Sequence, residues 1–261
     1  MHTAGIFLDY LKTYMKTHLT YRSNFWIEVS SDIMSIVVNM LFIVVIFNHT
    51  VLLDGWTRGE IIFIYGYFMV PLGIFSALFN IYNFSERYIV KGEMDRVLTR
   101  PVHNLAQVLL ENVDPPSLLT SVIGVIVMAY SWPQLGAGFG WWDPIVFVIM
   151  VAGSVMVYAG IYIMLTAISF FSDSPTGITN LMWNIQGYGR YPVTIYNKVL
   201  QFVLTWIIPF AFVGFYPAAY FLDEESLLLF SFLTPVMGAV FLGVSLKVWK
   251  WGVLRYRGAG S

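Results

Sequence analysis

Six long apolar stretches limit what this chain can fold into. They cover residues 25–47, 60–84, 115–135, 144–171, 199–222 and 226–250. A helix needs about 20 apolar residues to cross the hydrocarbon core of a bilayer, and each stretch reaches that length. Charged residues make up only 11% of the chain, against about 25% in soluble domains. The sequence therefore predicts an all-α integral membrane protein with six transmembrane helices, which form one domain over residues 25–250.

The segments that flank this domain are more polar. Residues 5–22 place apolar side chains at helical spacing, with Lys12 and Lys16 between them. This pattern is typical of a helix that lies along a membrane surface with its apolar face towards the lipid. We expect an amphipathic interfacial helix over residues 1–24, the alternative being a polar lead-in to the first span. Residues 251–261 are expected to form a cytoplasmic tail.

The basic residues orient the predicted spans. Six spans place both ends of the chain on one side, and cytoplasmic segments carry an excess of Lys and Arg. With the N-terminus inside, every Lys and Arg except Arg58 falls in an inner segment, including Arg190 and Lys198 before the fifth span. We therefore expect both termini in the cytoplasm. The short outer connections carry tryptophans suited to a membrane interface, namely Trp56, Trp132, Trp141 and Trp142.

The densest run of charge lies between the second and third spans, at residues 85–104. Gly92 is a predicted break, and a short amphipathic helix is expected to begin at Glu93, because acidic residues suit a helix N-terminus. Pro101 is expected to end this helix, since the residue before a proline is disfavoured in the α region. Residues 101–113 are predicted to continue as an amphipathic segment. A helix held at a membrane face suits a lever for a soluble partner; the alternative is a solvated loop.

Ionisable and polar side chains interrupt the first span. Glu28 and Asp32 lie one helical turn apart, and Asn39 falls on roughly the same face. Ionisable residues within spans are costly, so by default they face protein or water. One interpretation is that Asp32 and Asn39 form a polar seam that faces a pathway or a partner subunit. For Glu28 we favour a side chain that reaches back to the membrane interface.

Prolines and small residues mark special places in the other spans. The third span is expected to start near Pro116. Pro209 and Pro217 interrupt the fifth, where they predict hinges or a broken, re-entrant segment, because proline within a span needs neighbours that satisfy the freed backbone groups. Gly153 and Gly160 in the fourth span predict close helix packing.

Several kinds of chemistry are missing from the sequence. It has no cysteine, no phosphate-binding Gly-x-x-x-x-Gly-Lys loop and no paired zinc-binding histidines, so we expect no catalytic, metal or cofactor site on this chain. A net charge of −1 argues against a nucleic-acid partner. A membrane-embedded lipid-modifying enzyme remains a rival class, with Asp32, Glu111 and Asp114 as its only candidate residues. An ion channel or scaffold is a third.

Three stretches resemble permeases of the type-2 ABC exporter superfamily, and more narrowly a permease group that includes proposed viologen and drug exporters. The run from Tyr88 to Pro101 resembles the family's "GelDrlLlRP" segment. The C-terminal stretch from Trp249 to Ser261 resembles the family's ending. The third match, to the signature "srYP…iiPfaf…yyPa", is made by Arg190-Tyr191-Pro192, Ile207–Phe212 and Tyr216-Pro217.

The resemblance implies a six-span permease of an ATP-driven exporter that moves a hydrophobic or amphipathic substrate. Two cytosolic ABC ATPase subunits would be its partners, together with a second permease, identical or related. ATP and Mg would bind to the ATPases, so this chain would carry no cofactor. The implied location is the bacterial inner membrane, as a multi-pass protein.

The resemblance also assigns roles to segments and residues. Residues 85–104 would be the coupling helix that docks into the ATPase, residues 1–24 a connecting helix, and the outer end of the fifth span a re-entrant segment. Arg190, Tyr191 and Pro192 would brace the entry to the fifth span. The expected docking contacts and their flanking break and stop are Gly92, Glu93, Asp95, Arg96, Arg100 and Pro101.

Overall fold

The computed structural model describes residues 22–136, 138, 140–172 and 176–256. The predicted amphipathic helix over residues 1–24 therefore lies almost wholly outside the described residues. Apart from one isolated bridge, the described residues form helices, turns and loops, which confirms the predicted all-α fold. In this part of the chain, five helices are long and apolar enough to cross a membrane: α2 (Arg22–His49), α3 (Arg58–Leu78), α6 (Leu118–Leu135), α7 (Asp143–Ile168) and α11 (Leu228–Arg255).

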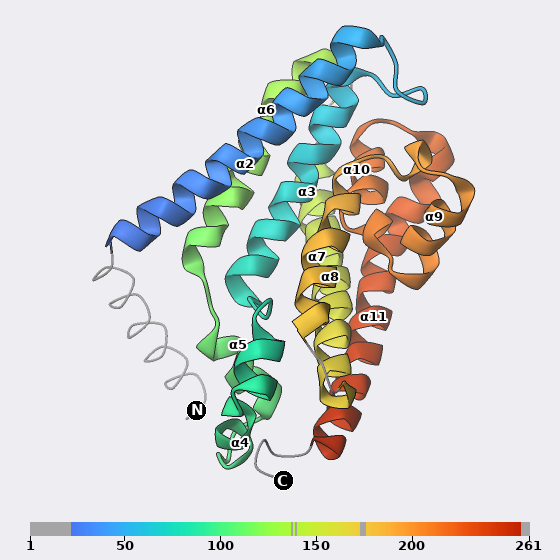
Figure 1. Cartoon of the computed structure of the whole chain (residues 1–261). Helices are drawn as coiled ribbons and strands as arrows, with labels where there is room; N and C mark the ends of the chain where they lie inside the picture. The colour runs from blue at the N-terminus through green and yellow to red at the C-terminus, as the bar shows by residue number, and fades with distance from the viewer. Residues whose placement is uncertain (1–21, 137, 139, 173–175, 257–261) are drawn as a thin grey trace.

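The bundle has two distinct ends (Figure 1). The connection between α2 and α3, which contains Trp56, lies at one end with the C-terminal end of α6. The short helices α4 (Glu93–Leu98) and α5 (Asn104–Glu111) lie at the other end, near the C-terminal end of α11. We refer to these as the Trp56 end and the α4 end.

Small residues let α7 and α11 approach closely. A side-chain carbon added to Gly153 would lie 2.8 Å from the Pro235 Cα, and one added to Gly160 would lie 2.8 Å from the Phe241 carbonyl carbon. Both distances are too short for non-bonded carbons, so only glycine allows this contact. The close packing predicted from Gly153 and Gly160 is confirmed.

Small residues also let α3 and α6 pack closely, although α3 contains a proline. A side-chain carbon on Gly124 of α6 would lie 2.7 Å from the Gly66 carbonyl oxygen of α3. Pro71 lies inside α3, and the Ser121 hydroxyl of α6 donates a 2.8 Å hydrogen bond to the neighbouring Val70 carbonyl. This hydrogen bond ties α6 to α3 at the residue before the proline.

The predicted fifth span, residues 199–222, is not one straight helix. The chain forms α9 (Lys198–Phe202) and the π-helical turn η6 (Val203–Ile207), then bends by 72° into η7 (Phe210–Phe212) and α10 (Phe215–Phe221). The predicted break is confirmed, with Pro209 at the bend.

Both ends of this bent segment, residues 198–221, which we call the hairpin, contact residues near the Trp56 end. At the α10 end, the Tyr220 hydroxyl donates to Asp143, the first residue of α7, at 3.2 Å. At the α9 end, the Gln201 side chain donates to the Thr194 carbonyl at 2.9 Å, and Trp56 donates to the Thr194 hydroxyl at 2.9 Å. Residues 198–221 therefore begin and end in the half of the bundle that holds Trp56.

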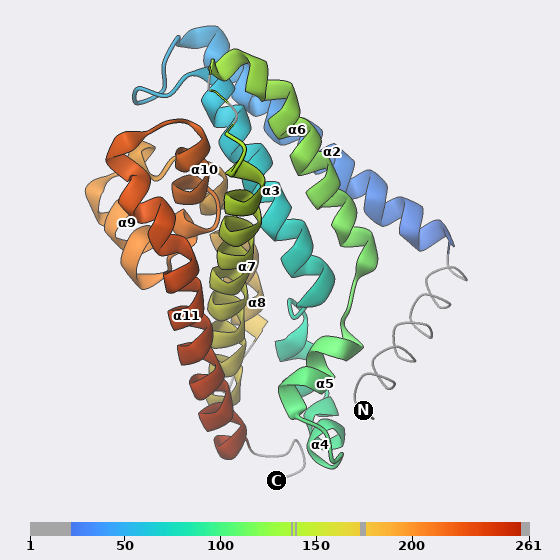
Figure 2. The same cartoon turned by 180° about the vertical axis from the view of Figure 1, so that it is seen from behind.

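The chain reaches this hairpin through a helix that the sequence analysis did not predict. Helix α8 (Thr176–Gln186) starts beside the π-helix η1 (Ser85–Val90) near the α4 end. Two 3₁₀ turns, η4 (Gly187–Arg190) and η5 (Val193–Ile195), carry the chain onward towards Trp56. The passage between α7 and the hairpin is thus built from short pieces, and Figure 2 shows the first of them, α8, behind α7.

This path corrects the prediction for two basic residues. Arg190 does not lie in a connection at the α4 end, because its guanidinium bonds to Asn39 in α2 within the bundle. Lys198 begins α9, in the half of the bundle that holds Trp56 (Figure 1). Hydropathy alone assigned the fifth crossing to residues 199–222, and this assignment wrongly placed Arg190 and Lys198 in the inner connection that precedes it.

Candidate coupling segment and polar cavity

The charged segment folds as predicted around Gly92. This glycine has φ +73°, a left-handed conformation that stops the preceding π-helix η1 and starts α4 at Glu93. Helix α4 ends at Leu98, ahead of Pro101, and α5 follows within the predicted 101–113 segment. The second span ends at Leu78, earlier than predicted, while the turn η2 (Pro115–Ser117) confirms the predicted start of the third.

Apolar contacts hold these short helices together. Met94 and Val97 of α4 are fully buried, as is Val108 of α5, and Leu105 is nearly so. A helix of six residues is too short to be stable alone in water. The folded shape of α4 therefore depends on its packing against α5 and η1.

A single carboxylate, Glu111 at the end of α5, joins the three elements. Arg96 of α4 donates to its two oxygens through both terminal nitrogens, at 2.8 and 2.6 Å. Gln107 donates at 2.9 Å, and the Tyr88 hydroxyl of η1 donates at 3.1 Å. The Glu111 side chain is only 8% exposed. We call Glu111, Arg96, Gln107 and Tyr88 the Glu111 cluster.

A second ion pair reinforces the Glu111 cluster from outside. Glu93 accepts a 3.0 Å hydrogen bond from Arg87 of η1 and a 3.4 Å one from Arg96. Arg100 lies 3.5 Å from Glu111. Three of the predicted docking residues, Glu93, Arg96 and Arg100, thus come together in contacts within the chain, and Asp95 is exposed.

The environment of the Glu111 cluster shifts its protonation equilibria. Burial raises the pKa of the Glu111 carboxyl, but hydrogen bonds from Arg96, Gln107 and Tyr88 and the charge of Arg96 outweigh burial and lower the pKa to about 2. The hydrogen bond to Glu111 raises the pKa of Arg96 above its usual value. Burial raises the pKa of Tyr88 to about 12. At neutral pH the Arg96–Glu111 pair is therefore fully ionised.

Direct contacts connect this segment to the long helices. The Trp249 indole of α11 donates to the Asn104 side chain at the start of α5, at 3.0 Å. The Asp114 amide donates to the Ala77 carbonyl near the end of α3, at 2.8 Å. A displacement of α4 and α5 would reach both α11 and α3.

The predicted bracing residues lie deeper in the bundle. Arg190 donates to the Asn39 side chain of α2. Pro192 is buried and precedes η5, and Tyr191 packs against the core. Arg190 and Asn39, predicted for two different roles, therefore meet in one contact.

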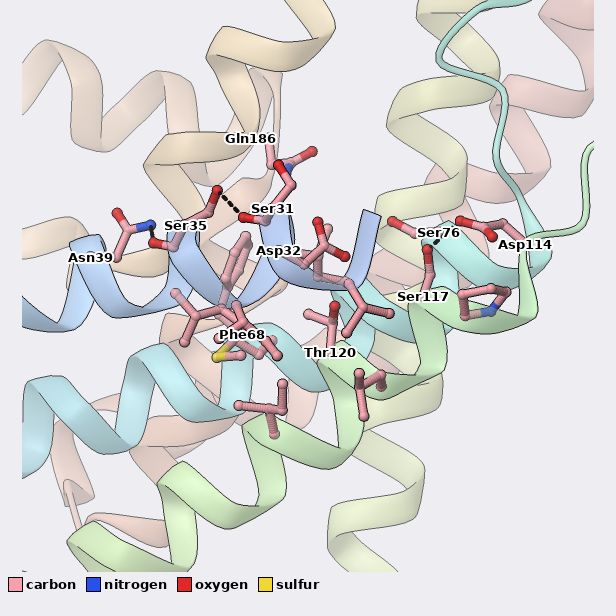
Figure 3. Close-up of a pocket in the computed structure, with 18 of the residues that line it drawn as sticks. Ser31, Asp32, Ser35, Asn39, Phe68, Ser76, Asp114, Ser117, Thr120 and Gln186 are labelled. Atoms are coloured by element: carbon pink, nitrogen blue, oxygen red, sulfur yellow. Dashed lines mark hydrogen bonds between the residues drawn. The ribbon is translucent and has the colours of Figure 1, made fainter. Parts of the chain in front are cut away.

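This contact borders a cavity of about 600 Å³ between α2, α3, α6 and η4 (Figure 3). Asp32 and Asn39, the predicted polar seam, both line its α2 wall, Asp32 as an exposed side chain and Asn39 as a half-buried one. Much of the remaining lining is hydroxyl or amide, from Ser31, Ser35, Ser76, Asn80, Asn83, Ser117, Thr120 and Gln186.

The charges of the cavity are few and of both signs. Asp32 and Asp114 supply carboxylates, and Arg190 is the one basic residue among those that line it. Glu111 is absent from the lining, so the three acids considered for a lipid-modifying enzyme do not form one site. Within the described ranges, no group of three His, Asp or Glu side chains could hold a metal ion.

A family model described as an ABC-2 family transporter protein matches residues 33–260. The chain belongs to the ABC-2 transporter family. No curated protein and no solved structure matches it. The protein is therefore a multi-pass membrane component of a transporter, and the family association with ABC ATPases carries over as a class of partner. The resemblance of the sequence to type-2 ABC permeases is confirmed.

The sequence of this ABC-2 permease predicted where the short charged helix begins, but it did not single out Glu111 as the residue that joins the segment together. Glu111 entered only as a candidate for a lipid-modifying enzyme. A usable signal was present, because Gln107 and Glu111 are four residues apart and share a face of a short amphipathic helix. The presence of Arg190 in the cavity had no such signal, since it depends on the course of α8.

Proposed function

We propose that this ABC-2 permease is the membrane subunit of an ATP-driven exporter, and that it couples to a separate ABC ATPase through α4. The observation that carries the proposal is the Glu111 cluster, which makes α4, α5 and η1 one unit at an exposed end of the bundle. Export of a hydrophobic or amphipathic substrate, ATP and Mg on the partner, two ATPases and a second permease belong to the same proposal.

The exposed tip of this unit suits a protein partner. Asp95 presents charge, while Leu98 and Val102 expose apolar surface at 40% and 37%. A mixed surface of this kind fits a docking contact better than a purely solvated loop. The charges of Glu93 and Arg96 are engaged within the chain, so they would shape the tip rather than meet the partner.

The contacts behind the tip supply a route for mechanical coupling. Force on α4 would pass through the Arg96–Glu111 pair to α5, and from Asn104 to Trp249 in α11. The same unit reaches α3 through the Asp114–Ala77 hydrogen bond. ATP-driven movement of the partner would thereby reach the long helices.

The distribution of charge supports a cytoplasmic α4 end, and a bacterial inner membrane as the location belongs to the same proposal. After Arg190 and Lys198 are removed from the count, the basic residues of η1, α4 and the end of α11 remain there. An excess of basic residues marks the cytoplasmic side. Since the chain has no cysteine, single substitutions can report this orientation cleanly.

The orientation test uses Asp95→Cys and Val51→Cys, with a membrane-impermeant maleimide applied to intact cells. We expect labelling of Val51→Cys, which lies in the α2–α3 connection, and protection of Asp95→Cys until the cells are opened. Labelling of Asp95→Cys in intact cells would refute the coupling role of α4.

The coupling test uses Asp95→Lys in the reconstituted permease–ATPase complex. We expect loss of substrate-stimulated ATP hydrolysis with normal membrane insertion, because the substitution reverses a charge at the docking tip. Glu225→Lys, in the exposed connection before α11 at the Trp56 end, makes the same charge change as a control and should leave hydrolysis unaffected. Equal behaviour of the two variants would count against α4 as the contact.

A further inference from the structure

The C-terminal end of α11, which lies at the α4 end (Figure 1), carries three basic side chains that the proposed coupling contact does not use. Lys247, Lys250 and Arg255 are all exposed, and α11 contains no Asp or Glu. Among the residues that the structure describes, none of the three has a carboxylate within 4 Å. Three positive charges therefore face outward without compensation from the described chain.

An aromatic side chain lies between two of these charges. Trp251 follows Lys247 by one helical turn and precedes Arg255 by another, so the three share one stripe of α11. The Arg255 guanidinium lies over the Trp251 ring, 5.8 Å from its centroid. Trp251 is 54% exposed and packs on Phe171, just after α7, with ring centroids 4.6 Å apart. We call Lys247, Lys250, Trp251 and Arg255 the basic face.

The opposite side of α11 is already covered by this chain. Trp249 and Tyr256 are two helical turns apart, and both pack edge-on against Phe170. The Trp249 indole also donates to Asn104 of α5. Asp95 of α4 interacts with Tyr256 on this covered side. The carboxylate of Asp95 therefore approaches α11 from the side away from the basic face.

The length of α11 places the basic face at the edge of the membrane. The helix has 28 residues, which span about 42 Å, whereas the hydrocarbon core is about 30 Å thick. Glu225, an exposed acid just before the helix, marks the other edge. Counted from Leu228, the roughly 20 residues that cross the core end at Lys247. The rest of the basic face then lies at the level of the head groups, where tryptophan and basic side chains are favoured.

We propose that the basic face binds the head group of an anionic phospholipid. The phosphate of the lipid pairs with the three basic side chains. Its acyl chains run along Val244 and Val240, which are exposed one and two turns deeper than Lys247 on the same stripe. A zwitterionic lipid would bring an ammonium group that the three cations repel, so the face selects a net negative charge. Binding needs no ATPase, so the inference goes beyond the proposed function and does not depend on it.

Trp251 offers a reporter in the basic face. The experiment uses the purified full chain in phosphatidylcholine vesicles and records the tryptophan fluorescence that Trp251→Phe removes. A small share of the lipid carries a nitroxide on its acyl chain close to the glycerol, either on phosphatidylglycerol or on phosphatidylcholine. A nitroxide quenches fluorescence at short range, so the two probes report which head group gathers at Trp251.

We expect labelled phosphatidylglycerol to quench Trp251 at about a fifth of the concentration that labelled phosphatidylcholine needs, or less. Each basic residue near an anionic surface contributes roughly a fivefold preference. Replacing Lys247, Lys250 and Arg255 together by glutamine should remove most of this difference. Lys247→Arg with Lys250→Arg keeps both charges and should keep the preference, which guards against a folding defect in the glutamine variant.

Lys91→Gln is the matched control, because it removes an exposed basic charge at the same end of the bundle, where Lys91 is paired with Glu86 at 2.8 Å. It should leave the preference unchanged. Equal quenching by the two probes in the wild-type chain would overturn the proposal, as would a preference that survives the triple glutamine variant. Salt should weaken the preference, since it screens exposed charges, and a preference insensitive to salt would contradict the proposal. Displacement of the labelled lipid by the partner ATPase would assign the basic face to a protein contact and would also overturn it.

Discussion

The Arg96 guanidinium holds the Glu111 carboxylate through both terminal nitrogens, at 2.8 and 2.6 Å, although the two residues lie on different helices. This two-point contact fixes orientation as well as distance. Because Tyr88 and Gln107 bond to the same carboxylate, no single neighbouring helix can shift without breaking a hydrogen bond to Glu111. The unit at the α4 end is therefore stiff in a way that its short helices alone would not be.

Replacing Glu111 should loosen this unit. Glu111→Gln leaves Arg96 without its carboxylate, and hydrogen bonds to charged groups contribute about 1.5–3 kcal/mol each. We expect amide exchange in α4 and α5 to accelerate roughly 10- to 100-fold, measured by hydrogen–deuterium exchange. Glu86→Gln, which removes an exposed ion pair with Lys91, is the control and should change exchange little. Similar exchange in both variants would mean that Glu111 does not hold α4 in place.

The same carboxylate predicts a pH dependence with a defined sign. The folded-state pKa of Glu111 is depressed to about 2, below its ordinary value of 4.5. Its stabilisation is therefore fully present above about pH 4.5 and is lost as the pH falls towards 2. In a ¹³C spectrum of glutamate-labelled protein, one carboxyl should titrate near pH 2, and Glu111→Gln should remove that signal. Titration of every glutamate near pH 4.5 would contradict this.

Gly92 should resist substitution because of its backbone, not its surroundings. Its φ of +73° costs a residue with a side chain about 1–2 kcal/mol. Gly92→Ala should therefore lower the stability of α4 and weaken coupling, measured by exchange in α4 and by stimulated ATP hydrolysis. Gly92→Asn should be milder, since asparagine tolerates the left-handed region better. Equal effects of alanine and asparagine would point away from backbone strain.

The contact between α7 and α11 should be sensitive to a single methyl group. In Gly153→Ala the added carbon would meet the Pro235 backbone at 2.8 Å, and overpacking of this kind costs about 1–3 kcal/mol. A lower melting temperature in detergent is the expected result. Gly243→Ala on α11 is the control, because a side chain there meets nothing within 4 Å. It should melt like the wild type.

The sequence allowed the long helices and the start of α4 to be predicted, because each depends on local signals. Apolar runs of membrane-spanning length and an acidic turn after Gly92 need no tertiary information. The hairpin at residues 198–221 was harder. Its apolar residues have the right number for one crossing, and only Pro209 and Pro217 indicated that the segment is broken.

The polar cavity was predictable in part. Asp32 and Asn39 pointed to an interior face of α2, since ionisable residues avoid lipid. The other wall could not be foreseen, because Arg190 and Asp114 approach α2 only through the course of η4 and η2. Long-range placement of this kind leaves no periodic trace in the chain.

Helix α2 leans away from α3 towards the α4 end (Figure 1), and this has a mechanical consequence. From Val29 to His49 the helix is about 30 Å long, with Asn39 near its midpoint. A rotation of α2 by about 10° about its His49 end would move the Val29 end by about 5 Å and Asn39 by about half as much. Such a rotation would have to break the hydrogen bond between Arg190 and Asn39. Asp32, which is nearer the Val29 end, would move farther than Asn39.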